Sequence, residues 1–269
     1  MPAILDAPLT PDAGAPTDPQ GGPLTMLRTL TFHLWMTFVT LIIGIFGLPS
    51  LLLDQKNRTR VCQFWCRSVL WGLEFFGGIK TKIQGLENVT PGGMVIAANH
   101  QSMWETMQIY AILPQPVIVL KEELLRIPLF GLWLKASGCI AIDRESGSKA
   151  MRKLLNDASA KTAAGGQIII FPEGTRRQPY SKTDLKPGIA GIYAATQVPC
   201  LPIAHNSGMH WQYPSHRIVP GIISMNIAEP ISTGLNRKSF MTSLEEILTQ
   251  LRPDALPFQP GTIDGTSHD

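Results

Sequence analysis

The block from Asn99 to Glu105 sets His100 five residues before the carboxylate of Glu105. It follows the apolar run Met94–Ala98 and precedes a helical pattern, so we expect it at the carboxyl end of a strand. Open α/β sheets usually bind their ligands at this end. A histidine there can take a proton from an alcohol, because its pKa lies near neutrality. The carboxylate can turn back to the other ring nitrogen, fix the tautomer and stabilise the imidazolium.

A structural role for Glu105 is also open. Ser102 and Glu105 match the pattern S-x-x-E, in which the glutamate closes a capping box at the start of a helix. The spacing of His100 and Glu105 alone does not choose between an orienting and a capping carboxylate.

A second polar block, Phe171–Arg176, has the sequence FPEGTR and follows the strand-like run Ile168–Ile170. Its proline and glycine predict a turn. That turn can present Glu173 as a carboxylate for hydroxyl groups and Arg176 as a forked cation for phosphate. A solvated charged loop is the alternative interpretation.

Two further segments accompany these blocks. The first contains Lys121, Leu124, Pro128, Gly131 and Gly138 and ends in Asp143-Arg144, just past another predicted strand. The second, Val198–Gly208, predicts a buried strand that opens into a glycine turn. Pro202 places this strand at a sheet edge, because proline cannot donate to a central ladder. The sequence lacks G-x-S-x-G, G-x-x-x-x-G-K-[ST] and G-x-G-x-x-G, so serine-hydrolase, P-loop and dinucleotide-binding functions lose their main support.

Strand-like and helical runs alternate from Ile79 onward. This pattern predicts an α/β fold with one catalytic domain, residues 79–252, built on a central twisted sheet flanked by helices. The predicted strands are Ile79–Ile83, Met94–Ala98, Val117–Leu120, Cys139–Ile142, Ile168–Phe171, Cys200–Ala204 and Gly221–Ile227. The clearest predicted helices are Ser102–Leu113, Ala150–Ala164 and Ile189–Thr196.

Residues 26–78 predict a hydrophobic membrane anchor of two helices. The run Thr29–Leu53 carries no charged side chain, and at about 1.5 Å per residue it could cross a hydrocarbon core of about 30 Å. A buried core helix is the alternative. The second run, Val61–Gly78, has aromatic residues that suit the membrane interface. The first run is interrupted by Gly44, Gly47 and Pro49, so we expect a pair embedded in one leaflet rather than a spanning helix.

Charge and composition add the expected location. Lys56, Arg58, Arg60 and Arg67 follow the first apolar run, whereas only Arg28 precedes it closely. By the positive-inside rule, the catalytic domain faces the cytoplasm from the inner membrane. The net charge of +3 suits an anionic membrane or a phosphate-bearing substrate and argues against a nucleic-acid-binding protein. Residues 1–25 predict a disordered tail, and residues 253–269 a loose one.

Together the four segments resemble the motifs of the glycerolipid acyltransferase family, typified by 1-acylglycerol-3-phosphate O-acyltransferases. The family motifs are N-H-x4-D, K-x2-L-x3-P-x2-G ending in D-R, F-P-E-G-T-R and V-P-x-x-P-[IV]. All four occur in order between Ile79 and Gly208. One departure is Glu105, where the family usually has aspartate. The extra methylene changes the reach of the carboxylate and leaves its charge unchanged.

The resemblance implies transfer of a fatty acyl group from an acyl-carrier-protein or coenzyme A thioester to the free hydroxyl of 1-acylglycerol-3-phosphate, giving phosphatidate. His100 would be the general base and Glu105 would orient it. The residues implied in substrate binding are Lys121, Arg144, Glu173, Gly174, Thr175 and Arg176. Of these, Arg144 and Arg176, with Lys121, would hold the acceptor phosphate, and Glu173 would bind a glycerol hydroxyl. No metal or other cofactor is implied, and the bilayer is the expected partner surface.

Two alternatives remain open. One is an acyltransferase that uses another lyso-lipid, such as a lyso-ornithine lipid or lysophosphatidylcholine. The other is a lipid-binding membrane protein that has kept the fold without catalysis, although such a protein has no need for His100 beside Glu105 in a full set of motifs.

Overall fold

The structure is a computed structural model that describes residues 22–143 and 147–254. The strands are β1 (Ile79–Gln84), β2 (Met94–Ala98), β3 (Pro116–Lys121), β4 (Ile140–Ile142), β5 (Gln167–Ile170), β6 (Cys200–His205) and β7 (Gly221–Ile227). The α-helices are α1 (Pro23–Phe46), α2 (Gln55–Phe75), α3 (Trp104–Ile112), α4 (Phe130–Ala136), α5 (Gly147–Ala163), α6 (Gly188–Thr196) and α7 (Arg237–Leu251). Short 3-10 turns are η1 (Leu48–Leu52), η2 (Leu86–Asn88), η3 (Glu122–Arg126) and η5 (Ser207–Met209).

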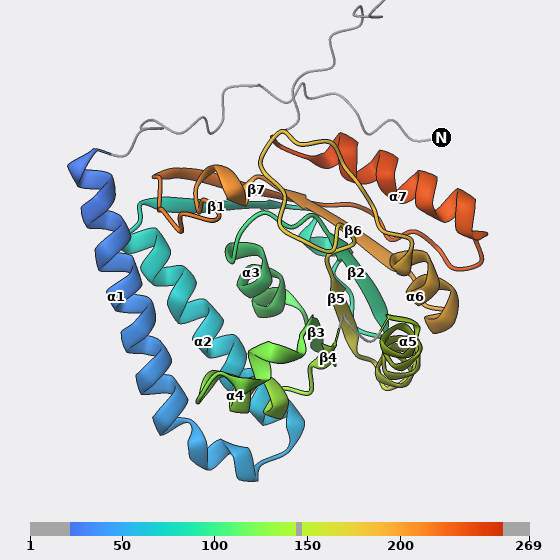
Figure 1. Cartoon of the computed structure of the whole chain (residues 1–269), viewed down its shortest axis with the longest axis horizontal. Helices are drawn as coiled ribbons and strands as arrows, with labels where there is room; N and C mark the ends of the chain where they lie inside the picture. The colour runs from blue at the N-terminus through green and yellow to red at the C-terminus, as the bar shows by residue number, and fades with distance from the viewer. Residues whose placement is uncertain (1–21, 144–146, 255–269) are drawn as a thin grey trace, which may run out of the picture.

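Within these residues the strands form one seven-stranded sheet in the order β1-β7-β6-β2-β5-β3-β4 (Figure 1). The strands β6, β2, β5, β3 and β4 are mutually parallel. β1 and β7 run parallel to each other and opposite to these five, because β7 pairs antiparallel with β6. The prediction of one α/β domain with a central sheet between helices is confirmed. Each predicted strand lies within one residue of its observed ends, whereas α4 and α7 are not among the helices that the sequence pattern singles out.

The prediction that the strand carrying Pro202 lies at a sheet edge is wrong. β6 lies between β2 and β7 in the interior of the sheet. The carbonyl of Pro202 accepts a hydrogen bond from Ala228 N at 3.0 Å, whereas the carbonyl of the next residue, Ile203, accepts one from Asn99 N beside β2 at 3.3 Å. The proline nitrogen therefore faces the β7 side. The ladder between β6 and β7 begins only at Ile203, so Pro202 interrupts no ladder hydrogen bond.

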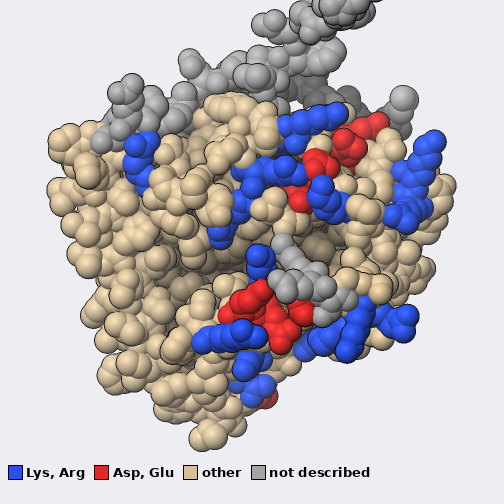
Figure 2. Space-filling view, viewed as in Figure 1, with Lys and Arg blue, Asp and Glu red and all other residues tan. Residues whose placement is uncertain are grey.

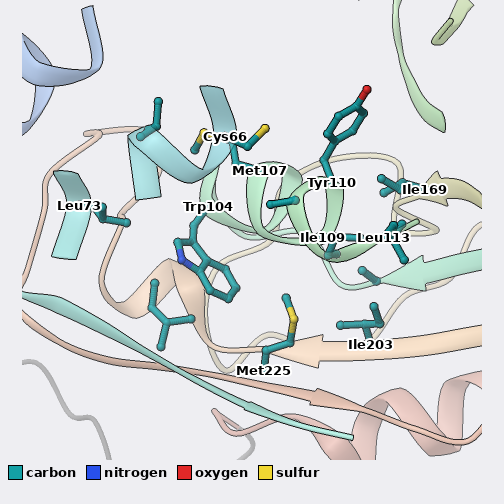
Figure 3. Close-up of a cluster of buried hydrophobic side chains, with 14 of the residues drawn as sticks. Cys66, Leu73, Trp104, Met107, Ile109, Tyr110, Leu113, Ile169, Ile203 and Met225 are labelled. Atoms are coloured by element: carbon teal, nitrogen blue, oxygen red, sulfur yellow. The ribbon is translucent and has the colours of Figure 1, made fainter. Parts of the chain in front are cut away.

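Two helical layers cover the sheet, as successive residues of β2 show. Ile96 and Ala98 pack into a core with α1, α2 and α3, whereas Val95 and Ala97 pack into a second core with α5, α6 and α7. Both faces of a parallel strand are thus buried, which explains its unbroken apolar sequence. In Figure 3, the Trp104 side chain of α3 lies between Leu73 of α2 and Met225 of β7. Helix α3, which follows His100, is therefore held on both sides.

The two N-terminal helices form an antiparallel hairpin along one side of the molecule (Figure 1). Trp35 Nε1 donates to Ser68 O at 2.9 Å, and Trp65 Nε1 donates to Thr40 Oγ1 at 3.0 Å. A side chain at Gly72 would collide with the Trp35 indole, since a Cβ there would lie 1.9 Å from it. The glycine therefore permits the close approach of the two helices.

Helix α1 begins and ends earlier than the sequence analysis predicts. The helix begins at Pro23, so the last residues of the predicted tail 1–25 are helical, and residues 1–21 lie outside the described part of the chain. A proline is well tolerated in the first turn because its missing N–H has no helical partner there. Gly47 and Pro49 end the helix and start η1 instead of bending it.

Helix α1 has one face in the protein core and one face exposed. Phe32 is fully buried, and its ring meets Trp211 edge to face at 5.0 Å between centroids. The Trp133 indole donates to the Gly44 carbonyl at 3.0 Å. The exposed large side chains of α1 are Leu24, Met26, Leu27, Leu30, Leu34, Phe38, Leu41, Ile42, Ile45 and Phe46. Among the described residues, α1 is the helix long and apolar enough to cross a membrane by length and composition.

Two of the cations that set the expected orientation donate hydrogen bonds to helix carbonyls of the catalytic domain. Arg58 Nε donates to Ala136 O at the end of α4, and Arg67 Nη2 donates to Ala111 O in the last turn of α3, each at 3.0 Å. Cations favour the carbonyl ends of helices, which carry partial negative charge. Lys56 and Arg60 are exposed, so they can still meet an anionic surface.

Candidate active site

The three central parallel strands β6, β2 and β5 place their carboxyl ends side by side. His100 follows β2, Glu173 follows β5 and Ser207 follows β6. Residues more than 100 positions apart in the sequence therefore meet at one edge of the sheet. The polar blocks expected after predicted strands lie where ligands bind in open α/β sheets.

His100 and Glu105 form a hydrogen-bonded pair. His100 Nδ1 lies 2.7 Å from Glu105 Oε1, with side-chain exposures of 16% and 0%. The His100 ring stacks on Phe171 at 4.2 Å between centroids and 17° between planes. Because the carboxylate can only accept while Glu105 is ionised, Nδ1 carries the proton and Nε2 is the basic nitrogen. This arrangement gives His100 a fixed ring plane and a defined tautomer.

The Glu105 carboxylate also accepts four other hydrogen bonds. Oε1 accepts from Gln101 N at 2.9 Å and Ser102 N at 2.8 Å. Oε2 accepts from Ser102 Oγ at 2.7 Å and Ser207 Oγ at 2.8 Å. The contacts to backbone N–H groups are those of a capping residue, and the contact to His100 is that of an orienting residue. The same oxygen, Oε1, therefore makes the contacts that both interpretations of Glu105 require.

Glu105 is held in its ionised form. Burial opposes the charge, but the neighbouring His205, the hydrogen bond from His100 and the hydroxyl of Ser102 favour it, and the pKa of Glu105 falls well below its ordinary value. His205 is fully buried, and burial lowers the pKa of its ring, although the neighbouring Glu105 opposes this. Its Nε2 lies 2.7 Å from Asn99 O, and Asn99 Nδ2 donates to His205 O at 3.0 Å. These bonds join the end of β6 to the start of residues 99–103, the loop between β2 and α3 that carries His100 (the His100 loop).

Glu173 is a second buried carboxyl group in the same region. It is 4% exposed, and its Oε2 has no hydrogen-bond partner within the described residues. Burial raises the pKa of Glu173 to about 7, although the His100 backbone, Arg252 and Arg177 oppose the rise. A carboxyl group in this state can accept from or donate to a ligand hydroxyl near neutral pH.

The arginines of the FPEGTR segment contact the His100 loop. Arg176 Nε donates to Ser102 O at 3.1 Å, and its guanidinium carbon lies 4.6 Å from the centre of the Tyr213 ring. Arg177 N donates to His100 O at 2.7 Å, while its side chain pairs with Asp184. The Arg176 guanidinium is thus fixed beside the His100 loop, as a phosphate ligand would need.

The remaining sequence-predicted residues occupy different positions. Gly174 adopts a positive φ of 72°, which a turn at this point requires, and Thr175 is exposed. Lys121 is exposed at the end of β3, two strands away from β2. Arg144 lies outside the described residues. In Figure 2, Lys, Arg, Asp and Glu side chains border a hollow near the centre of this face, whereas the surface over α1 and α2 is largely uncharged.

An apolar cavity of about 120 Å³ lies between the N-terminal hairpin and the helices α3 and α4. Residues from all four helices line it, among them Ile43, Trp65, Met103, Met107, Phe130 and Trp133. Met103 and Trp104 follow the His100 loop directly, so the wall of the cavity begins three residues after the histidine. Among residues 22–143 and 147–254, no group of three or more His, Cys, Asp or Glu side chains could hold a metal ion.

Several polar residues of the site were missed by sequence reasoning. Ser207, His205 and Gln101 are each at most 2% exposed and bond to the His100 loop or to Glu105 itself. Their partners lie about 100 residues away, except for the local Gln101 contact. A polar triplet at the end of an apolar strand, as at His205–Ser207, is the signal that could have identified two of them.

Comparisons with known proteins identify the family of this chain. The family model described as Acyltransferase matches residues 80–206. The 1-acyl-sn-glycerol-3-phosphate acyltransferase of Pseudomonas aeruginosa is 34% identical over 75% of this chain and 79% of its own length. The lyso-ornithine lipid O-acyltransferase of Rhizobium meliloti is 26% identical over 66% of this chain and 59% of its own length.

The fold has a counterpart among solved structures. The crystal structure of the 1-acyl-sn-glycerophosphate (LPA) acyltransferase, PlsC, from Thermotoga maritima superposes with a TM-score of 0.70 at 21% identity, covering 84% of this chain and 94% of that one. The fold, the His100–Glu105 pair beside the FPEGTR segment, and the level of identity to curated relatives agree with one another. The chain therefore belongs to the glycerolipid acyltransferase family and is an acyltransferase.

Proposed function

We propose that this enzyme transfers a fatty acyl group from an acyl-carrier-protein or coenzyme A thioester to the free hydroxyl of 1-acylglycerol-3-phosphate, giving phosphatidate. The observation that supports this most is the 2.7 Å contact between His100 Nδ1 and the buried carboxylate of Glu105. It leaves Nε2 of a partly exposed imidazole as the base. The relative from Pseudomonas aeruginosa carries the same substrate in its name.

The reaction follows from this geometry. His100 Nε2 takes the proton from the acceptor hydroxyl as its oxygen attacks the thioester carbonyl. The imidazolium that forms is stabilised by Glu105 through Nδ1–H, as in other histidine–carboxylate pairs. When the tetrahedral intermediate collapses, the carbon–sulfur bond breaks and the imidazolium returns the proton to the leaving thiolate. An ester and a free thiol result, and His100 is neutral again.

The acceptor would be held by the FPEGTR segment. Arg176 is fixed beside Ser102 by its Nε bond, which orients its terminal N–H groups for a phosphate. Lys121 would add charge at the end of β3. Arg144, which lies outside the described residues, would be a further ligand of the phosphate. Glu173 Oε2, buried and without a protein partner in the described region, would bond to a glycerol hydroxyl.

We propose that the apolar cavity between the hairpin and α3 receives part of one hydrocarbon chain of the reaction. It has the apolar lining that such a chain needs, and its wall begins beside the His100 loop. Helices α1 and α2 contribute part of that lining. The helices that we propose to embed in the bilayer would therefore also help to bind substrate.

The membrane proposal is a hairpin embedded in one leaflet of the inner membrane, with the catalytic domain on the cytoplasmic side. Its support is the way α1 packs. Catalytic-domain residues contact α1 at Phe32, through Trp211, and at Gly44, through Trp133. These points are about 18 Å apart along the helix. A helix that crossed the bilayer between them could not touch one domain at both.

Purified enzyme and a panel of acceptors test the proposal. The acceptors are lysophosphatidate, lysophosphatidylcholine and a lyso-ornithine lipid, each with acyl-carrier-protein and coenzyme A thioesters. We expect the highest kcat/KM for lysophosphatidate, because Arg176 and its neighbours favour a phosphate monoester. A higher kcat/KM for the lyso-ornithine lipid, which the Rhizobium meliloti relative makes the specific alternative, would contradict the acceptor assignment.

A further inference from the structure

The chain turns inward after α7. Arg252 is 8% exposed and Asp254 is 2% exposed, whereas the sequence predicts a loose tail from residue 253. That expectation is wrong for Pro253 and Asp254, the residues of this segment that the structure describes. The buried side chains of this short segment are the polar ones of Arg252 and Asp254. The sequence has no long apolar run here that would predict a buried segment.

The two side chains form a buried ion pair with further bonds to two loops. Arg252 Nε lies 3.1 Å from Asp254 Oδ1, and Arg252 Nη2 lies 2.7 Å from Asp254 Oδ2. Asp254 Oδ2 also accepts from Gln101 Nε2 at 2.8 Å and from Tyr180 N at 3.1 Å. Arg252 Nη1 donates to Ser181 O. One loop carries His100, and the other follows Arg176.

Gln101 connects the ion pair to the base. Its backbone N–H donates to Glu105 Oε1 at 2.9 Å, and its side-chain Oε1 accepts from Gly208 N at 3.0 Å. Both ends of its amide are therefore engaged, one with the loop after β6 and one with Asp254. The Gln101 side chain is 2% exposed, so its neighbours hold it in one position.

We propose that Arg252 and Asp254 are positioning residues of the active site, which fix the His100 loop and the loop after Arg176 relative to each other. This inference rests on the proposed function, because it assigns the pair to the same catalytic reaction. A buried ion pair adds little net stability, since desolvation offsets its attraction, but its directional bonds fix the geometry of what they hold. Small displacements of a catalytic group lower the rate steeply.

The test uses a double-mutant cycle in the full-length enzyme. The variants are Gln101→Leu, Asp254→Ala and the double variant, each assayed with lysophosphatidate and a thioester donor at a temperature at which it is folded. We expect kcat to fall about tenfold or more in each single variant, with the donor KM within about twofold of wild type. The double variant should be no slower than the slower single variant, because both changes break the same contact.

Phe240→Leu is the matched control. Phe240 is fully buried in α7, the same helix that carries the segment, and stacks on Tyr193 away from the site. This change should lower the melting temperature and leave kcat unchanged. Should Asp254→Ala not fold, Gln101→Leu, which leaves the ion pair intact, carries the test alone.

The outcomes separate this inference from the proposed function. Wild-type enzyme without transfer to lysophosphatidate would overturn the proposed function. An active wild type with kcat of Gln101→Leu within twofold of it would overturn the positioning role. Losses of kcat that multiply in the double variant would also overturn it, because they would show that the two changes act independently.

Discussion

At the scale of single residues, the Glu105 carboxylate joins the backbone at the start of α3 to the ring of His100. Oε1 accepts from two backbone N–H groups and from Nδ1, so a shift of the helix start would move the imidazole as well. The family's usual aspartate is one methylene shorter. Here the longer side chain reaches the His100 ring and also accepts hydrogen bonds from the hydroxyls of Ser102 and Ser207.

Glu105→Gln separates the charge of this side chain from its shape. The amide oxygen can still accept from the two backbone N–H groups, and the amide nitrogen can donate to the serine hydroxyls. We therefore expect a folded protein whose stability changes by about 1 kcal/mol or less. The imidazolium loses its counter-charge, so kcat should fall by at least about tenfold. Thermal melting and initial rates measure the two effects, and a fully active variant would mean that Glu105 is a cap alone.

Glu173 makes the stability of the fold depend on pH. Burial raises its pKa from 4.5 to about 7 in the folded state. Because the folded-state pKa is the higher one, the stability linked to protonated Glu173 is fully present below about pH 4.5 and is lost as pH rises through about 7. Glutamine resembles the protonated acid.

We therefore expect Glu173→Gln to melt higher than wild type at pH 8, with a smaller difference at pH 5. Differential scanning calorimetry at both pH values measures this. An equal difference at the two pH values would show that ionisation of Glu173 is not the cause.

The candidate base and its carboxylate could be predicted from sequence because both are local, five residues apart after an apolar strand. The contacts that hold them could not. Ser207 reaches Glu105 across 102 positions, and Asp254 reaches Gln101 across 153. No periodicity or spacing encodes such pairs, because they depend on strand order in the sheet, which the pattern of strands leaves undetermined.

At the scale of elements, α1 has a face in the protein core and an exposed apolar face on the other side. Phe32 is 0% exposed against Trp211, and Phe38, nearly two turns later, is 55% exposed. Both phenylalanines lie in the same uncharged run, so the sequence alone does not distinguish the buried one from the exposed one. An apolar run does not show which of its sides meets protein, so the sequence left a buried helix and a membrane helix as competing interpretations.

These two residues give a matched pair of variants. Phe32→Ala should lower the free energy of unfolding in detergent by about 3–5 kcal/mol, as for other buried phenylalanines. Phe38→Ala should change it by about 0.5 kcal/mol or less. Denaturant unfolding of both variants measures the difference. Equal losses would contradict the division of α1 into a core face and an exposed apolar face.

Strand positions could be predicted closely because buried parallel strands are continuous apolar runs bounded by turn residues. The order of the strands in the sheet was harder to predict from the sequence. Pro202 suggested an edge, yet the local start of the β6–β7 ladder at Ile203 makes an interior place possible. Helix α4 is only seven residues long, too short for helical periodicity to stand out.

At the scale of the whole molecule, the largely uncharged surface over the hairpin and the hollow bordered by charged side chains lie on the same face (Figure 2). The embedded hairpin predicts that both ends of the chain stay in the cytoplasm.

Cysteine labelling tests this topology. In intact cells, a reagent that cannot cross the inner membrane should fail to label Ala15→Cys, and it should label the residue once the membrane is disrupted. Lys149→Cys, exposed on α5, is the cytoplasmic control and should behave identically. Labelling of Ala15→Cys in intact cells would mean that α1 crosses the bilayer, and release of the protein by salt alone would contradict membrane embedding.

The central claim is that His100 is the base of an acyl transfer to lysophosphatidate. The most direct measurement is the rate of phosphatidate formation by His100→Ala, with His33→Ala on α1 as the control histidine. Folding of both is checked by thermal melting. Loss of a general base costs about 10²- to 10⁴-fold in rate, so His100→Ala should be folded and slower by that factor, while His33→Ala keeps wild-type turnover. A folded His100→Ala enzyme that forms phosphatidate at near wild-type rate would contradict the account.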